Sequence, residues 1–184
     1  MPPPDPDLSA LAERVRSGDR AAVERLFRAV HPDLVRYGRS LADADDAEDA
    51  VQDAFVALWR RRQTLDPSRS VRALLYAAVR NRLLNLHRDT TRRRDLLDAM
   101  DAPDRPLLPD EHAGAALLAD RVRAGVDTLP ARQREALSLS RFDGLSYAEI
   151  ADVMGCSVKT VENHVGRALR ALRDHLGRVA PDAL

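Results

Sequence analysis

The segment that decides the fold is Ser146-Tyr-Ala-Glu-Ile-Ala-Asp-Val-Met-Gly-Cys-Ser-Val-Lys-Thr-Val-Glu-Asn-His-Val-Gly-Arg-Ala-Leu-Arg170. From Tyr147 to Met154, apolar residues recur at i, i+3, i+4 and i+7, which is one face of a two-turn helix. Gly155 follows at the position where helices commonly end in a left-handed conformation. A second, longer helix begins near Val158. A short helix, a glycine-bearing turn and a longer helix predict a helix-turn-helix.

The polar side of the second helix is the candidate DNA-reading face. Apolar residues from Val161 to Leu176 form the other side, which we expect to pack against the domain. In a major groove, asparagine can bind adenine and arginine can bind guanine, while lysine favours phosphate. Glu162 is discordant, because a carboxylate repels phosphate unless it accepts from a cytosine amino group or pairs with a neighbouring arginine. The predicted DNA contacts are Lys159, Glu162, Asn163, His164, Arg167 and Arg170. The alternative is a solvated face on an ordinary helical hairpin.

The rest of the chain is also patterned as helices, and strand signals are scarce, with aromatic residues at only 4%. Asp19 is the expected N-cap of the second helix, and the acidic stretch 43–49 suits the positive end of the third. The expected helices run from Leu8 to about Val15, from Asp19 to near Leu41, from 43–49 to Arg62, over roughly 69–92, from Leu117 to Val126, and over Ala131–Arg141 with Pro130 in the first-turn position.

Residues 101–111 interrupt this helical pattern with three prolines and four acidic residues. Proline lacks a backbone donor and blocks helix propagation, so this stretch is expected to be a linker. We therefore predict an all-α protein of two small helical domains. They are an N-terminal helical bundle (8–95) and a C-terminal helix-turn-helix domain (113–178), joined by a Pro-rich acidic linker (96–112).

The net charge of zero hides a strong segregation of charge along the chain. Residues 1–59 carry 7 arginines and 12 acidic residues, whereas residues 60–94 carry 11 arginines and only 2 acidic residues. Net charges of −5 and +9 in adjacent blocks suggest a segment that faces a polyanion beside a surface for something else.

Several other classes of function find no support in the sequence. A single cysteine, Cys156, excludes an internal disulfide and a multi-cysteine zinc site, and the five histidines show no metal-binding spacing. There is no phosphate-cradling glycine loop and no nucleophile motif. We therefore predict no catalytic residues, no metal and no cofactor. With no apolar run near the ~20 residues of a membrane span and no signal-peptide pattern, we expect a cytoplasmic protein.

A resemblance to a known family rests on two further stretches. The stretch Asp46-Ala-Glu-Asp-Ala-Val-Gln-Asp-Ala-Phe-Val-Ala-Leu-Trp-Arg-Arg-Arg-Gln63, followed by Val71–Asn85, closely resembles the core-binding and promoter-melting helices of extracytoplasmic-function (ECF) sigma factors. Leu129-Pro-Ala-Arg-Gln-Arg-Glu-Ala-Leu137 looks like the start of the same family's domain for the upstream promoter element. The resemblance covers roughly 8–95 and 113–176, in the family's order and spacing.

The resemblance implies partners and residue roles. Core RNA polymerase would be bound through the coiled coil of its largest subunit and through its flap, promoter DNA would be the second partner, and an anti-sigma factor is an allowed third. Direct membrane insertion is not expected. The residues matching the polymerase-binding segment are Asp46, Glu48, Asp49, Gln52 and Asp53. Those matching the segment that recognises and opens the downstream promoter element are Arg72, Tyr76, Arg80, Asn81, Asn85 and Arg88.

The chain departs from the family's common pattern in this downstream segment. Where relatives often have phenylalanine and tryptophan, it has Val71 and Leu74, so Tyr76 is the only aromatic residue there. Strong stacking on several bases is therefore not expected. Capture of a single flipped base, with Asn81 or Asn85 hydrogen-bonding its edge, remains open.

Two other classes of protein are alternatives to a sigma factor. Val158–His164 also resembles regulators of the response-regulator or quorum-sensing type, but these usually carry a receiver or ligand-binding domain with strands, which residues 1–95 do not suggest. An anti-sigma or adaptor protein without DNA contact would have no need of the +9 segment. The sequence therefore favours a sigma factor that binds core polymerase, directs it to promoters and helps open the DNA.

Overall fold

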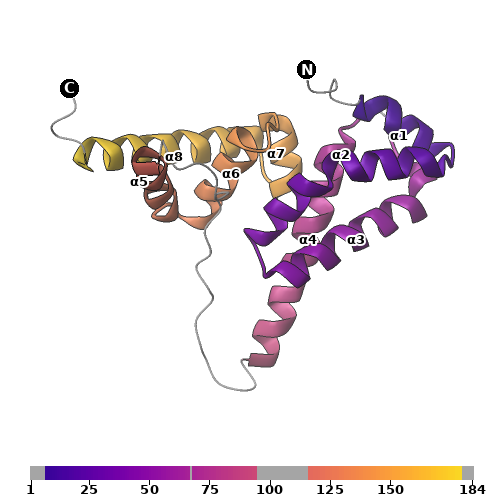
Figure 1. Ribbon diagram of the computed structural model, residues 1–184, viewed down its shortest axis with the longest axis horizontal. Helices are drawn as coiled ribbons and strands as arrows, with labels where there is room; N and C mark the ends of the chain where they lie inside the picture. The colour runs from indigo at the N-terminus through magenta and orange to yellow at the C-terminus, as the bar shows by residue number, and fades with distance from the viewer. Residues whose placement is uncertain (1–6, 67, 95–115, 180–184) are drawn as a thin grey trace. The chain divides into compact units, whose positions relative to one another are not determined.

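The computed structural model describes residues 7–66, 68–94 and 116–179, and every regular element in these ranges is helical (Figure 1). The all-α fold predicted from the sequence is therefore confirmed. Contacts within the chain divide it into two compact units, Met1–Asp104 and Arg105–Leu184. The predicted linker, 96–112, lies outside the described residues.

The first unit is a bundle in which the three longest helices pack against one another and α1 lies against α2 and α4 (Figure 1). Its described elements are α1 (Leu8–Arg16), α2 (Arg20–Arg39), α3 (Ala44–Arg60), the 3₁₀ turn η1 (Arg62–Thr64) and α4 (Val71–Arg94). Its largest fully buried side chains are Val15, Leu26, Leu34, Val51, Leu75, Tyr76 and Val79. Burying one large apolar side chain is worth about 1.5–3 kcal/mol, so packing of these faces, rather than helix propensity, holds the bundle together.

Aspartate side chains fix the starts of the first three helices. Asp7, Asp19 and Asp43 are the N-caps of α1, α2 and α3. Asp19 Oδ1 accepts a hydrogen bond from the backbone N–H of Ala22 at 3.2 Å, so the predicted N-cap is confirmed. Each such cap satisfies a backbone donor that has no partner within the helix.

Two helices end before the point that the apolar pattern predicts. Helix α2 ends at Arg39 rather than near Leu41, and α3 ends at Arg60 rather than Arg62. After α3, the Arg62 guanidinium donates to the carbonyl of Trp59 at 2.9 Å and lies 4.3 Å from the Trp59 ring centroid. This side chain supplies a donor to a carbonyl at the helix end, which lets the chain turn there.

The second unit is built around its last helix. Its described elements are α5 (Ala116–Asp127), α6 (Ala131–Arg141), α7 (Tyr147–Met154) and α8 (Val158–Val179), and α8 packs against the other three. The apolar side of α8 is buried at Val161, Val165 and Ala168, whereas Leu172 and Leu176 stay half-buried. Pro130 is the N-cap of α6 and so lies one residue before the predicted first-turn position.

Candidate functional site

Helices α7 and α8 form the helix-turn-helix that the sequence predicts. Ser146 Oγ accepts from the backbone N–H of Glu149 at 3.3 Å, and the Glu149 carboxylate accepts from the backbone N–H of Ser146 at 2.8 Å. Gly155 ends α7 with φ 63° and ψ 44°, which is the left-handed conformation expected there. Ser157 Oγ then accepts from the backbone N–H of Thr160 at 3.1 Å. Side chains thus fix the start of each helix, and the glycine turn joins the two.

The side of α8 opposite its buried row carries the predicted DNA-contacting residues. Lys159, Glu162, Asn163, Arg167 and Arg170 lie on this side of the helix, and His164 is half-buried. At Gly166 a Cβ atom would meet nothing within 4 Å, so the helix backbone is open to close approach there.

An ion pair explains how the discordant carboxylate is accommodated in the free protein. Lys159 Nζ donates to Glu162 Oε2 at 3.0 Å, so in the free protein Glu162 pairs with a lysine, a partner that was not among the two possibilities considered from the sequence. Val158, the first residue of α8, is 43% exposed and was missed by the sequence analysis. An apolar side chain at this end of a reading helix suits contact with a thymine methyl group.

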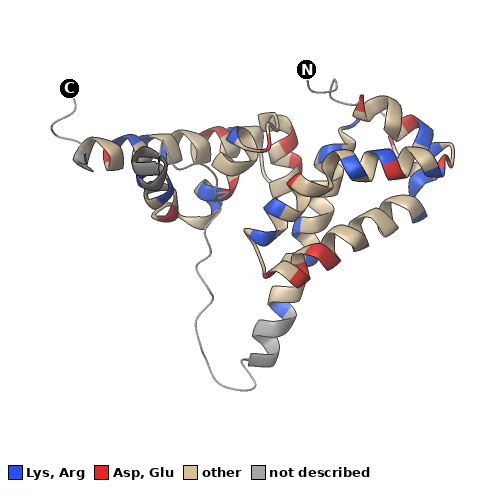
Figure 2. Ribbon diagram, viewed as in Figure 1, with Lys and Arg blue, Asp and Glu red and all other residues tan. Residues whose placement is uncertain are grey.

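The predicted polymerase-binding residues lie along one helix, α3, whose first half gathers acidic residues (Figure 2). Asp46, Asp49, Gln52 and Asp53 line its outer side together with Glu48, which is half-buried. We refer to these five residues as the acidic face of α3.

Neighbouring helices already engage two carboxylates of the acidic face. Glu48 Oε1 lies 3.0 Å from His31 Nε2 on α2, and Asp53 Oδ2 accepts from Arg82 Nε on α4 at 2.9 Å. The remaining surface has an apolar residue, Val56, which is 48% exposed and was not singled out from the sequence. Helical spacing could have identified Val56, because positions 49, 52, 53 and 56 lie on the same side of a helix.

The structure buries part of the predicted downstream promoter contact. Tyr76 is 0% exposed and Arg80 only 6% exposed, so neither side chain is accessible to DNA in the free protein, contrary to the expectation from the sequence. The reason is that α4 turns them toward the bundle, where the Tyr76 ring packs against Tyr37 of α2 with a centroid separation of 5.1 Å. Arg72, half-buried beside them, donates to Asp33 Oδ2 on α2 at 3.1 Å.

The other three residues predicted to contact the downstream element have the opposite environment. Asn81, Asn85 and Arg88 are all exposed. At 100° per residue they lie within roughly 40° of one direction on the helix. Leu74, which replaces an aromatic residue of the family pattern, is 47% exposed on the same helix. The surface that α4 offers a partner is therefore amide-rich and carries one large aliphatic residue in place of aromatic rings.

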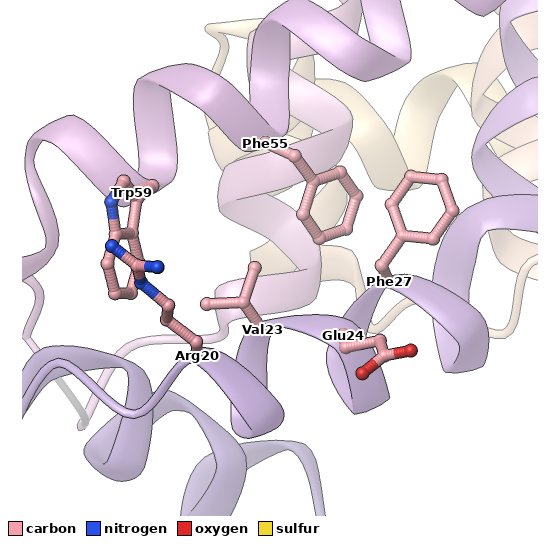
Figure 3. Close-up of a pocket in the computed structure, with 6 residues that line it drawn as sticks. All are labelled: Arg20, Val23, Glu24, Phe27, Phe55 and Trp59. Atoms are coloured by element: carbon pink, nitrogen blue, oxygen red, sulfur yellow. The ribbon is translucent and has the colours of Figure 1, made fainter.

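A shallow hollow of about 380 Å³ lies between α2 and α3 (Figure 3). The residues that line it are Arg20, Val23, Glu24, Phe27, Phe55 and Trp59. Phe27 and Phe55 meet edge to face at 4.9 Å, which secures the two helices to each other. Phe55 is buried and Trp59 half-buried, as expected of residues that serve the core.

The described part of the chain holds neither a candidate metal site nor a helix suited to span a membrane. No group of three or more His, Cys, Asp or Glu residues there could hold a metal ion. Within the same residues, no helix is both long enough and apolar enough to cross a membrane.

A helix-turn-helix in one helical unit and a helix with exposed amides and arginine in the other define a DNA-binding transcription protein. Comparison with known proteins gives its family. Sigma-70 region 2 matches residues 26–93, and sigma-70 region 4 matches residues 119–172. The sigma factor CnrH of Cupriavidus metallidurans is 34% identical over 187 residues, covering 95% of this chain and 97% of CnrH. The ECF sigma factor SigC of Mycobacterium tuberculosis is 31% identical over 180 residues, covering 98% and 95%.

Solved structures agree with these matches. CnrH in complex with the cytosolic domain of CnrY has a TM-score of 0.65 at 30% identity, covering 92% of this chain and 97% of CnrH. The sigma factor RpoE of Bartonella quintana, in complex with the anti-sigma factor NepR, has a TM-score of 0.69 at 27% identity, covering 83% and 95%. The chain belongs to the ECF family of RNA polymerase sigma factors, which direct the polymerase to promoters. Matches to both sigma-70 regions leave the response-regulator alternative without support.

Proposed function

We propose that the chain initiates transcription through three separate surfaces: the acidic face of α3 for core RNA polymerase, the Asn81, Asn85 and Arg88 stripe of α4 for the downstream promoter element, and the polar side of α8 for the upstream element. The observation that carries this proposal is the exposure of all three stripes, while the apolar side of each helix is buried. An acidic surface suits a basic protein partner and would be repelled by DNA phosphate.

The polymerase surface is proposed to have an apolar centre at Val56. Binding energy at protein interfaces concentrates in a few well-desolvated residues surrounded by polar ones. Asp49, Gln52 and Asp53 lie beside Val56 on the same side of α3 and supply that polar rim.

Co-purification with core polymerase tests this surface. Asp49→Arg and Val56→Arg should each weaken the complex at least about tenfold, because each places a positive charge against a basic partner. Glu13→Arg is the matched control, since Glu13 is an exposed acidic residue of α1 outside the acidic face. Unchanged co-purification of both the Asp49→Arg and the Val56→Arg variants would remove α3 from the interface.

The upstream contact is proposed to divide between base recognition and phosphate binding. Asn163 and Arg167 are assigned to bases, and Lys159 to phosphate. Losing one good bidentate base contact costs about 1–3 kcal/mol and relaxes preference at one position, whereas losing a phosphate contact weakens all sequences alike. Selection from a randomised upstream element distinguishes the two, with exposed Arg173→Ala as the control. A uniform loss across sequences for Arg167→Ala would refute its role in base recognition.

The downstream contact is proposed to act in strand opening. Asn81 and Asn85 can hydrogen-bond the edge of an unpaired base, and Arg88 can bind phosphate. The Asn81→Ala, Asn85→Ala double variant should lower permanganate reactivity of a duplex promoter and be partly rescued by a pre-melted bubble. Gln63→Ala, exposed in η1, is the control. Normal opening in the double variant would contradict the assignment.

A protein inhibitor is proposed as a further partner. Two sigma factors similar to this chain, CnrH and the Bartonella RpoE, were each solved in complex with another protein, the cytosolic domain of CnrY and the anti-sigma factor NepR. An anti-sigma factor of this chain would compete with core polymerase for it. Affinity capture from the native cell, followed by run-off transcription with and without the captured protein, tests for inhibition.

A further inference from the structure

An ion pair joins two of the proposed surfaces in the first unit. Arg82 Nε on α4 donates to Asp53 Oδ2 on α3 at 2.9 Å, and the two side chains are 47% and 57% exposed. Asp53 belongs to the acidic face of α3, whereas Arg82 was assigned to no surface by the sequence. The pair therefore links the helix proposed for polymerase to the helix proposed for promoter DNA.

Arg82 borders the exposed stripe of α4. At 100° per residue, position 82 lies roughly 60° around the helix axis from position 85 and about one turn before it. Its guanidinium therefore extends from the edge of the surface formed by Asn81, Asn85 and Arg88 toward α3. A guanidinium in this position pairs with the carboxylate of Asp53 and also borders the surface that is proposed to contact unpaired bases.

We infer that Arg82 is a further promoter contact, held by Asp53 in the free protein and released when core polymerase takes Asp53. This inference rests on the proposed roles of α3 and α4. A cationic side chain of the polymerase that pairs with Asp53 weakens the hold of Asp53 on Arg82. The freed guanidinium then binds a DNA phosphate through two parallel N–H donors, a geometry that arginine favours.

The strength of the pair suits an exchange of this kind. Ion pairs between half-exposed side chains are weak, equivalent to an equilibrium change of about two- to fivefold. Competition for Asp53 is therefore enough to break the pair. Because coupling between two binding events is reciprocal, DNA bound at Arg82 strengthens polymerase binding at Asp53 by the same factor.

The Arg72–Asp33 pair of the same helix serves as a contrast. Its side chains are 28% and 34% exposed, and Arg72 Nε is buried without a hydrogen-bond partner. Asp33 lies on α2, outside the acidic face of α3. We therefore expect this pair to hold α4 against α2 whether or not polymerase is bound.

A double-mutant cycle on the free full-length protein tests the DNA half of the inference. The probe is a fluorescein-labelled DNA duplex of random sequence, because phosphate contacts do not depend on sequence. Asp53→Asn should bind it about two- to fivefold more tightly, with a salt dependence steeper by about 0.9 in log–log slope. In the Arg82→Gln background that gain should shrink to the gain given by Asp49→Asn, which reflects the loss of negative charge alone.

The control separates release of Arg82 from general removal of negative charge. Asp49→Asn also deletes a carboxylate of the acidic face, but no ion pair joins Asp49 to α4 among the described residues. Its effect on duplex binding should be the same in the wild-type and Arg82→Gln backgrounds. If Asp53→Asn gives the same gain in the wild-type and Arg82→Gln backgrounds, the inference is overturned.

The second cycle measures affinity for purified core RNA polymerase. Arg82→Gln should tighten this complex about two- to fivefold when Asp53 is present, and leave it unchanged in the Asp53→Asn background. Equal effects in both backgrounds would overturn the inference. Failure of the proposed polymerase surface has a different signature, because Asp49→Arg would then leave core binding intact while the DNA cycle could still succeed.

Discussion

Replacing Tyr76 by alanine separates a structural role from a DNA-contacting role. The ring is fully buried and lies 5.1 Å from the ring of Tyr37, centroid to centroid. Removing a buried aromatic side chain costs about 3–5 kcal/mol, since its contacts are lost and a cavity remains. Small domains are stable by only about 5–15 kcal/mol, so the first unit should lose a large share of its stability.

Urea unfolding followed by tryptophan fluorescence measures this loss of stability in the first unit. Trp59 is the only tryptophan in the chain and lies on α3 of the first unit. With a urea dependence of about 2 kcal/mol per molar, Tyr76→Ala should lower the unfolding midpoint by about 2 M. Asn81→Ala, exposed on the same helix, is the control and should change stability by less than about 0.5 kcal/mol.

The opposite pattern would refute the structural role. A Tyr76→Ala protein with the wild-type urea midpoint, but with reduced permanganate reactivity of duplex promoters, would show that the ring meets an unpaired base. In that case Tyr76 would have to leave the core when the polymerase opens DNA.

Three further predictions concern local structure, and each has its own measurement. Ser146→Ala should destabilise the second unit by about 1 kcal/mol in thermal unfolding, because it removes the N-cap of α7; an unchanged melting temperature would contradict this. Gly155→Ala should lower the stability of the second unit by about 1–2 kcal/mol, because a φ of 63° strains any residue with a Cβ atom. A Cβ there would meet no atom within 4 Å, so the loss comes from the backbone conformation alone, and a stabilised variant would refute the argument. The hydrogen bond from Arg14, and then that from the Ala22 N–H, lowers the pKa of Asp19 below its ordinary value, so its contribution to stability is full above about pH 4 and is lost as pH falls through the lowered value. The free energy of unfolding of Asp19→Asn should therefore fall less than that of the wild type as the pH drops through that range. The same pH dependence in both proteins would contradict the prediction.

The three exposed stripes differ in how well the sequence predicted them. On α8 and on the acidic face of α3, the sequence correctly separated the exposed side from the buried one, because each of these helices has a single apolar side. On α4 it did not separate the two sides, because Tyr76 and Arg80, expected to be exposed, are buried. The buried residues of α4, which include Val71, Ala73, Leu75, Tyr76, Val79, Arg80 and Leu83, spread around much of the helix.

This failure on α4 has a physical cause. The helix packs against α1, α2 and α3 at once, so apolar residues are needed on several of its sides, and periodicity no longer points to one direction. Arg80 and Tyr76 also have polar groups, which in the sequence suggest a surface position. Their burial depends on which helices surround them, and no local spacing encodes that.

By itself, the sequence determined the features that depend on neighbours within a few residues. The all-α class, the N-cap at Asp19, the left-handed glycine at position 155 and the helix-turn-helix all follow from local hydrogen bonding, backbone conformation and helical periodicity. Only the tertiary structure decided which residues of α4 face outward and that Asp53 meets Arg82. Those two residues are 29 positions apart, so their pairing arises from the packing of α3 against α4 and has no signature in either helix alone.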